Sequence, residues 1–156
     1  MGGMSRTPLP ILAFAPLRWT SLPGPSRRVL AQLARTRSVL VLETPEAIDE
    51  RDERQFWELS CAESDLIVCR PRVANPSEFA NSATTVRMVR ALLAWLDIDA
   101  FVAWHYAPSA LAFVRVLSPS LVIHDRSFDA LIPSVRAERA ANAAAALAEA
   151  EAAGSG

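Results

Sequence analysis

A histidine and an aspartate stand side by side where an apolar segment of the chain ends. The apolar residues 121–123 precede His124 and Asp125, and Ser127 follows two positions later. An imidazole there can bind a hydroxyl group or move a proton near a reacting centre. Asp125 can orient the imidazole or bind a hydroxyl itself, although neighbours on an extended strand point to opposite faces. We therefore predict that His124 and Asp125 are catalytic and that Ser127 binds substrate. A structural histidine followed by a capping aspartate is the alternative.

A second polar group follows another apolar segment. His105 and Tyr106 stand between Trp104 and Pro108, and a proline suits the first turn of a helix. Aromatic side chains at the end of a strand can form a wall for a sugar ring, because they combine an apolar body with a polar tip. We predict that His105 and Tyr106 bind substrate. The alternative is that Trp104 belongs to the core and the other two are its neighbours.

A third candidate region joins the first expected strand to the first expected helix. It contains Arg18, Trp19, Gly24 and Arg27. Backbone amides at the start of a helix can receive a phosphate or a sugar hydroxyl, and arginines can add charge-assisted hydrogen bonds. We predict that these four residues bind substrate, with an ordinary surface loop as the alternative. The dinucleotide-binding and P-loop glycine patterns are absent from the sequence.

Short apolar segments alternate with segments of helical periodicity, which indicates a parallel α/β sheet. Strands are expected at residues 11–15, 39–42, 66–69, 101–104 and 121–123. Helices are expected from Ser26 as the N-cap, weakly over 46–64, over 86–96 and from Pro108 onward, with a loop over 71–76. Apolar strands without alternation suit burial on both faces. We predict a three-layer Rossmann-like domain over residues 1–133 with a parallel sheet of about five strands. Residues 134–156 are predicted to form an Ala-rich, loosely held helical tail.

Composition narrows the function. The net charge is −1, so bulk charge favours neither nucleic acid nor an acidic membrane. All 16 basic residues are arginines, which excludes a Schiff-base or P-loop lysine. With two histidines and no spaced cluster, we predict no metal site and no cofactor.

The cysteines and the lengths of the apolar segments indicate the cellular compartment. Cys61 and Cys69 are the only cysteines, and we expect two buried thiols in a reduced cytoplasmic protein. No apolar run reaches the ~18 residues of a membrane span. The apolar residues 9–17 are interrupted by prolines and fit a buried strand better than a signal peptide.

Several segments together resemble glycosyltransferase family 4, the retaining sugar transferases of the GT-B fold, and teichuronic-acid-type enzymes most of all. VIHDRSF at residues 122–128 resembles the family's VTIHDLSF, and Pro133 falls where its proline does. WHYAP at 104–108 resembles an aromatic WYYTP segment. The opening resembles the family's first strand, Gly-rich loop, helix and second strand through PLRW at 16–19, GPSRR at 24–28, LAR at 33–35 and VLVLETP at 39–45.

The resemblance implies the N-terminal, acceptor-side half of a GT-B fold, with His124 near the donor sugar in the cleft between two domains. It implies a nucleotide sugar and a glycan or lipid-linked acceptor as ligands once a second domain completes the enzyme, and a role in cell-envelope polysaccharide synthesis. A cytoplasmic protein without a membrane span is expected, with peripheral membrane contact allowed.

The family's donor-binding domain is not found in these residues. We therefore expect the chain to be a fragment or shortened relative, inactive alone, because transition-state stabilisation needs the donor site. A non-catalytic binding module or degenerate α/β module is the alternative.

Overall fold

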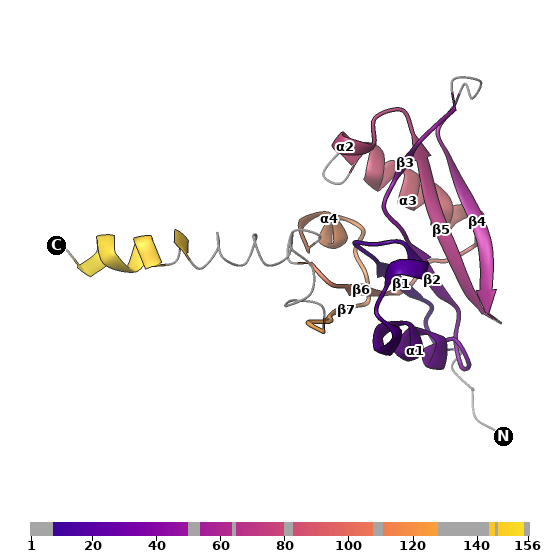
Figure 1. Ribbon diagram of the computed structural model, residues 1–156, viewed down its shortest axis with the longest axis horizontal. Helices are drawn as coiled ribbons and strands as arrows, with labels where there is room; N and C mark the ends of the chain where they lie inside the picture. Colours follow the sequence, from indigo (N-terminus) through magenta and orange to yellow (C-terminus); the bar gives the residue numbers. More distant parts are fainter. Residues whose placement is uncertain are drawn as a thin grey trace.

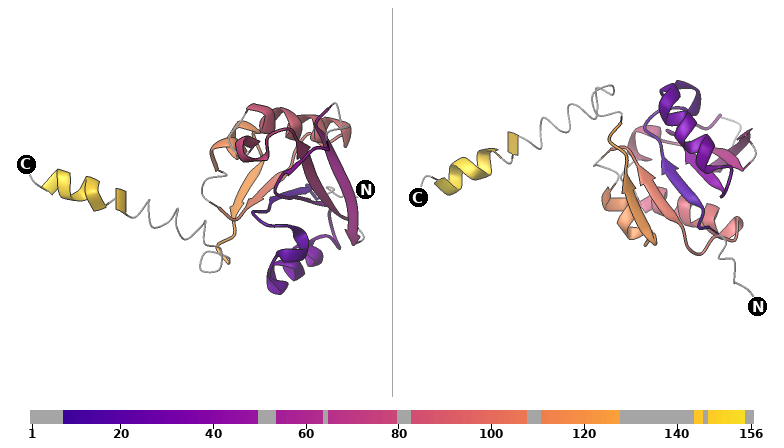
Figure 2. Two further views of the ribbon diagram at one scale, coloured as in Figure 1. Left: turned by 45° about the horizontal axis from the view of Figure 1, so that its top comes forward. Right: turned by 90° about the horizontal axis from the view of Figure 1, so that it is seen from below.

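The fold is an α/β fold with a mostly parallel sheet and helices on both faces, as the sequence predicts, although the sheet has seven strands rather than about five and β4 is antiparallel. The computed structural model describes residues 8–49, 54–63, 65–79, 83–107, 111–127, 144–145 and 147–154. Its seven-stranded sheet has the order β3-β5-β2-β1-β6-β7, and β4 lies beside β5. Figures 1 and 2 show α1 on one face of the sheet and α3 on the other.

The elements follow one another as strand, helix and strand along most of the chain. The strands are β1 (Ile11–Phe14), β2 (Val39–Leu42), β3 (Glu46–Ala47), β4 (Phe56–Glu63), β5 (Leu66–Val73), β6 (Val102–His105) and β7 (Leu121–His124). The helices are the 3-10 turn η1 (Trp19–Ser21), α1 (Gly24–Leu33), α2 (Pro76–Phe79), α3 (Ala83–Trp95) and α4 (Leu111–Val116).

The register of the sheet brings several strand ends to one edge. Phe14 at the end of β1 pairs with Leu42 of β2 and with His105 of β6. His105 in turn pairs with His124 of β7. These strands are parallel, so the residues that follow them gather at the carboxyl edge of the sheet, where open α/β sheets bind ligands.

Alternate residues of the central strands feed two apolar cores. On the α1 face, Ile11, Ala13 and Val41 pack with Leu30 of α1. On the other face, the alternate strand residues, such as Leu12 and Leu40, pack with Val89 of α3 and Val114 of α4. Both faces of β1 and β2 are therefore buried, which explains why these strands are apolar throughout.

The end of α3 is fixed by a residue in the left-handed region. Asp97 has φ 58°. The amide of Ile98 donates to the carbonyl of Leu93 at 2.8 Å, and the amide of Asp97 donates to Ala94 at 3.2 Å. These are the two bonds of a Schellman motif. They turn the chain directly from α3 into β6, which supplies His105.

The prediction of a helix over residues 46–64 is wrong. The structure has β3 there, and then β4, which runs antiparallel to β5. Along β4 the half-buried Trp57 and Leu59 alternate with the exposed Phe56 and Glu58. This alternation has the period of a strand with one covered face, and it is the signal that the helical interpretation missed.

Three smaller expectations are also corrected. Residue 71 does not begin a loop, since β5 runs through Pro71 to Val73. The proline lies where the ladder on one side of β5 passes from β2 to β3, between the pairs at 69 and 72. Ser26 is not the N-cap, because α1 begins at Gly24 and Ser26 is buried in its first turn. Cys61 is exposed, while Cys69 is buried as expected.

The described part of the tail is helical, at residues 144–145 and 147–154, and its described side chains are exposed. In Figure 1 this helix stands apart from the sheet. No described helix is long and apolar enough to cross a membrane.

Candidate functional site

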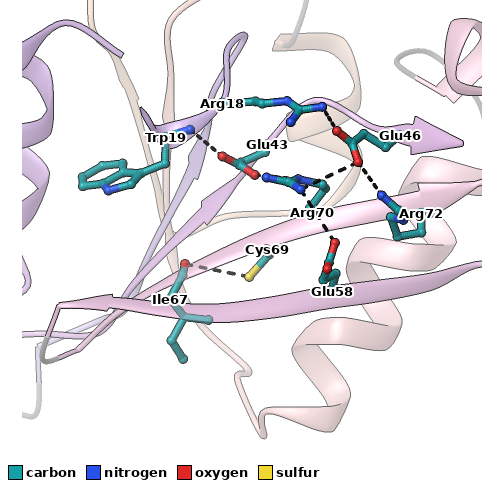
Figure 3. Close-up of polar contacts among 9 residues, drawn as sticks. All are labelled: Arg18, Trp19, Glu43, Glu46, Glu58, Ile67, Cys69, Arg70 and Arg72. Atoms are coloured by element: carbon teal, nitrogen blue, oxygen red, sulfur yellow. Dashed lines mark hydrogen bonds and ion pairs between the residues drawn. The ribbon is translucent and has the colours of Figure 1, made fainter. Parts of the chain in front are cut away.

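The polar residues at the carboxyl edge form two groups. One lies at the ends of β6 and β7 and contains His105, His124 and Asp125. The other lies just after β2 and within β3 and β5, and it consists of interlocked arginines and glutamates (Figure 3). The sequence predicted the first group as catalytic or substrate-binding residues, and it gave no role to the carboxylates of the second.

The two histidines of the chain stack on each other. The ring centroids of His105 and His124 are 4.6 Å apart, and the ring planes differ by 7°. The contact follows from the sheet, because the two residues are register partners on adjacent parallel strands. His105 is 2% exposed, whereas His124 is exposed. The pair therefore presents one accessible imidazole backed by one buried imidazole.

The buried imidazole has a defined proton arrangement. Nδ1 of His105 lies 3.0 Å from the carbonyl oxygen of Ala107. A carbonyl only accepts, so Nδ1 carries the proton and donates it, and Nε2 of the neutral ring keeps its lone pair. Burial lowers the pKa of His105, the bond to Ala107 partly offsets this, and the nearby His124 lowers it further. His105 is consequently neutral near pH 7.

Asp125 and Ser127 form a tight turn after β7. The amide of Ser127 donates to Oδ1 of Asp125 at 2.9 Å, which is an Asx turn. The amide of Asp125 donates to the carbonyl of His105 at 2.8 Å. The Oγ atoms of Ser127 and Ser26 approach to 3.4 Å. This contact joins the end of β7 to the first turn of α1.

Tyr106 is fully buried in the core on the α1 side of the sheet. Burial raises the pKa of its hydroxyl above the usual range, and the negative charge of Asp125 raises it further. Tyr106 therefore stays neutral. It packs as a core residue rather than forming an exposed wall for a sugar ring.

A buried carboxylate organises the second group. Glu43 directly follows β2, and its side chain is 2% exposed. One oxygen accepts the backbone N–H of Trp19, and the other accepts a bond of 3.0 Å from Nε of Arg70 (Figure 3). Burying a carboxylate is unfavourable unless it is paired and hydrogen-bonded, and both conditions hold for Glu43.

Glu46 extends the network outward. It pairs with Arg18, with Arg72 and, at 3.7 Å, with Arg70. Glu58 on β4 approaches Arg70 at 3.8 Å. Three arginines thus pair with three glutamates, so the charges within this group largely neutralise one another.

Cys69 lies beside this network at the end of the β2 pairing. Burial, with a contribution from the negative charge of Glu43, raises the pKa of its thiol to about 12. The thiolate is the reactive form. Cys69 is therefore a packing residue and not a nucleophile.

The remaining predicted binding residues lie along the loop and first turn between β1 and α1. Arg18 is about half exposed, and Trp19 packs partly buried against the core on the α1 side. Gly24 begins α1, and a Cβ there would meet only Arg28, at an ordinary 3.5 Å. Nε of Arg27 is buried with no hydrogen-bond partner among the described residues.

These residues share the carboxyl edge but not one face. Trp19 belongs to the α1 side of the sheet. By the alternation of β6, His105 and its stacked partner His124 lie on the side of α3 and α4. Among the predicted residues, His105 and His124 are therefore in contact, whereas His124 and Trp19 lie on opposite sides of the sheet.

Two hollows on the surface lie away from these residues. One of about 360 Å³ lies at the opposite, amino edge of the sheet and includes Arg37, Asp65 and Leu96. The other, about 220 Å³, lies between β4 and α3 and is lined by Trp57, Leu59, Ala91, Leu92 and Trp95. No cluster of three or more metal-binding side chains occurs among the residues that the structure describes.

No protein-family model matches the chain, and no curated protein matches it at a significant level. A solved structure from E. coli, described as trehalose-6-phosphate bound with UDP-2-fluoro glucose, is similar in arrangement. It is 13% identical, with a TM-score of 0.47, over 82% of this chain. The match spans 36% of that chain, so this chain corresponds to about a third of its length.

Proposed function

We propose that this chain is the acceptor-side part of a retaining glycosyltransferase, related to family 4, and that it binds a glycan or lipid-linked sugar. In this proposal, it works in the cytoplasm with a donor-binding domain that holds the nucleotide sugar. Without that domain it gives no turnover, because half of the transition-state contacts are missing.

The paired histidines carry the proposal. An exposed imidazole at the carboxyl end of a parallel strand can donate to or accept from a sugar hydroxyl. The stack on His105 restricts the orientation of the His124 ring, and His105 is itself held through Ala107. The HD-x-S segment that contains His124 is also the segment that most resembles the family.

The other residues have supporting roles in the proposed site. Asp125 shapes the turn that follows His124, and Ser127 offers a hydroxyl near Ser26. Arg18 is half exposed at the same edge, and the guanidinium N–H groups not paired with Glu46 can donate to a polar group of the ligand. Tyr106 supports the site from the core and does not touch ligand.

One observation favours the alternative, a non-catalytic binding module. Oδ1 of Asp125 already accepts the amide of Ser127, so this carboxylate is used in the turn and is a poorer proton carrier. A binding module needs only the hydrogen bonds of His124. The two functions differ in whether a donor domain restores sugar transfer.

The test is a titration of the purified chain with octyl glucoside, as a lipid-linked acceptor, and with UDP-glucose and GDP-mannose. We expect octyl glucoside to bind, and His124→Ala to weaken its affinity about tenfold, which corresponds to one lost hydrogen bond. Arg35→Ala, at an exposed position after α1, is the control and should leave affinity unchanged.

Absence of octyl glucoside binding by the wild-type chain would overturn the proposed acceptor site. An affinity loss in His124→Ala that only follows a loss of folded protein would assign His124 a structural role. Adding a donor-binding domain then separates the two functions, since transfer from a nucleotide sugar is expected only for the glycosyltransferase.

A further inference from the structure

The loop between β1 and α1 is held from outside by carboxylates. Within the 3-10 turn η1, the amides of Ser21 and Leu22 donate to the carbonyl of Arg18 at 2.8 and 3.1 Å. The amide of Trp19 stands at the start of this turn, where no carbonyl of the turn can accept it. Its partner is the Glu43 side chain, 24 residues away in the chain.

Both the backbone and the side chain of Glu43 are held by β5, independently of the loop. Its backbone amide donates to the carbonyl of Cys69 at 2.9 Å, which ties it to β5. Its carboxylate receives Arg70, also on β5, at 3.0 Å. The acceptor for the Trp19 amide is therefore attached to the interior strands of the sheet and not to the loop (Figure 3).

A second carboxylate holds the neighbouring residue. Glu46 pairs with Arg18, and Arg72 and Arg70 hold Glu46 from β5. The Trp19 ring packs against the core on the α1 side. Backbone, charge and ring thus fix the segment at three points, while the guanidinium of Arg18 stays half exposed.

We propose that Glu43 is a positioning residue: held by Arg70, it sets the conformation of the Arg18–Trp19 segment for ligand binding. This rests on the proposed function for the ligand, but the positioning itself is a property of the folded chain. Glu43 touches no ligand and acts through the Trp19 amide. A charge-assisted bond to a backbone N–H is among the stronger hydrogen bonds of a protein, so one carboxylate suffices.

The first measurement is hydrogen exchange at the Trp19 amide. In Glu43→Ala we expect this amide to exchange about tenfold to a hundredfold faster, as for the loss of a bond to a charged group. The amide of Leu40, inside β2, is the internal reference for global opening. Glu43→Gln should keep most of the protection, because its amide oxygen still accepts the bond.

Glu58→Gln is the matched control. Glu58 also lies beside Arg70, but on β4 and about half exposed, and it makes no contact with the loop in the network described above. The same substitution there should leave the Trp19 amide unchanged. If Glu43→Ala fails to fold, the NMR resonance of the Trp19 amide in Glu43→Gln tests the positioning role instead. That resonance should shift, since a neutral acceptor replaces a carboxylate, and it should stay in place in Glu58→Gln.

Titration with octyl glucoside links the position to binding. We expect affinity to fall severalfold in Glu43→Ala and to recover in Glu43→Gln. If the Trp19 amide exchanged as slowly in Glu43→Ala as in wild type, the positioning role would be overturned. Equal changes of Trp19 amide exchange in the Glu43 and Glu58 variants would overturn it as well. Failure of the wild-type chain to bind octyl glucoside would instead count against the proposed function, because the exchange result does not depend on ligand.

Discussion

The two halves of the carboxyl edge use their polar groups in opposite ways. At the ends of β2 and β5, the carboxylate of Glu43 and the guanidinium of Arg70 are engaged with each other, and Glu43 also holds the loop through the Trp19 amide. Beyond β6 and β7, His105 is anchored by one nitrogen, and His124 stands exposed on top of it. One half is internally neutralised, and the other has hydrogen-bonding capacity to offer.

The difference separates support from chemistry. A saturated ion network mainly fixes geometry, since each charge already has a partner and breaking one pair leaves another charge buried. An exposed imidazole carries ring nitrogens that can donate a hydrogen bond to a ligand or accept one from it. We therefore assign positioning to Glu43 and its arginines, and the main ligand contact to the His124 half, with Arg18 as a second contact from the loop.

The largest effect should come from removing the partner of the buried carboxylate. Arg70→Ala leaves Glu43 buried without its arginine, and we expect the free energy of unfolding to fall by about 3 kcal/mol. Urea denaturation measures this. Glu58→Ala removes only an exposed member of the network and should cost less than about 1 kcal/mol. Similar losses in the two variants would show that the network is not organised around Glu43.

Acid should destabilise the chain through His105, in the histidine half of the carboxyl edge. The pKa of His105 is lowered in the fold, so on acidification the unfolded state binds its proton first. Stability should therefore be full above the unfolded value of about 6.5 and fall as the pH drops below it. Thermal unfolding from pH 7 to pH 5 should show this decline in wild type and a smaller one in His105→Gln. A stability that rises on acidification over this range would contradict the assignment of His105 as a buried neutral ring.

The smallest effect should come from the link between β7 and α1. The hydroxyl contact between Ser26 and Ser127 is long, at 3.4 Å, so Ser127→Ala should change the free energy of unfolding by less than about 0.5 kcal/mol. Its effect on octyl glucoside affinity is the informative value. A clear loss of affinity without a loss of stability would show that the ligand also contacts Ser127, next to the first turn of α1.

Local patterns were sufficient where one physical effect dominates. The strands β1 and β2 were predicted correctly because they are apolar throughout, and they are apolar because both of their faces are covered. The periodicity of α3 likewise predicts its buried side, including Val89 and Leu92. The region of β3 and β4 was misassigned because only one face of β4 is covered, which leaves a mixed pattern.

The candidate site was only partly predictable. Adjacency to a strand end marked His105 and His124, but their stacking depends on β6 and β7 being neighbours in register. Tyr106 was predicted to bind substrate, yet it packs in the core, because alternation along the strand turns it to the α1 side. Glu43 looked like the end of a strand, and nothing within its own segment indicates that Arg70 and Trp19 meet it.

By itself, the sequence determined the alternation of strands and helices, the absence of lysine chemistry and the placement of polar residues after apolar strands. These are properties of short segments, governed by side-chain burial and backbone propensity. Only the tertiary structure decided which strand ends are neighbours, which face each side chain takes and which charges neutralise one another. Those contacts join residues tens of positions apart, so their energies exist only once the sheet has assembled in its particular order and register.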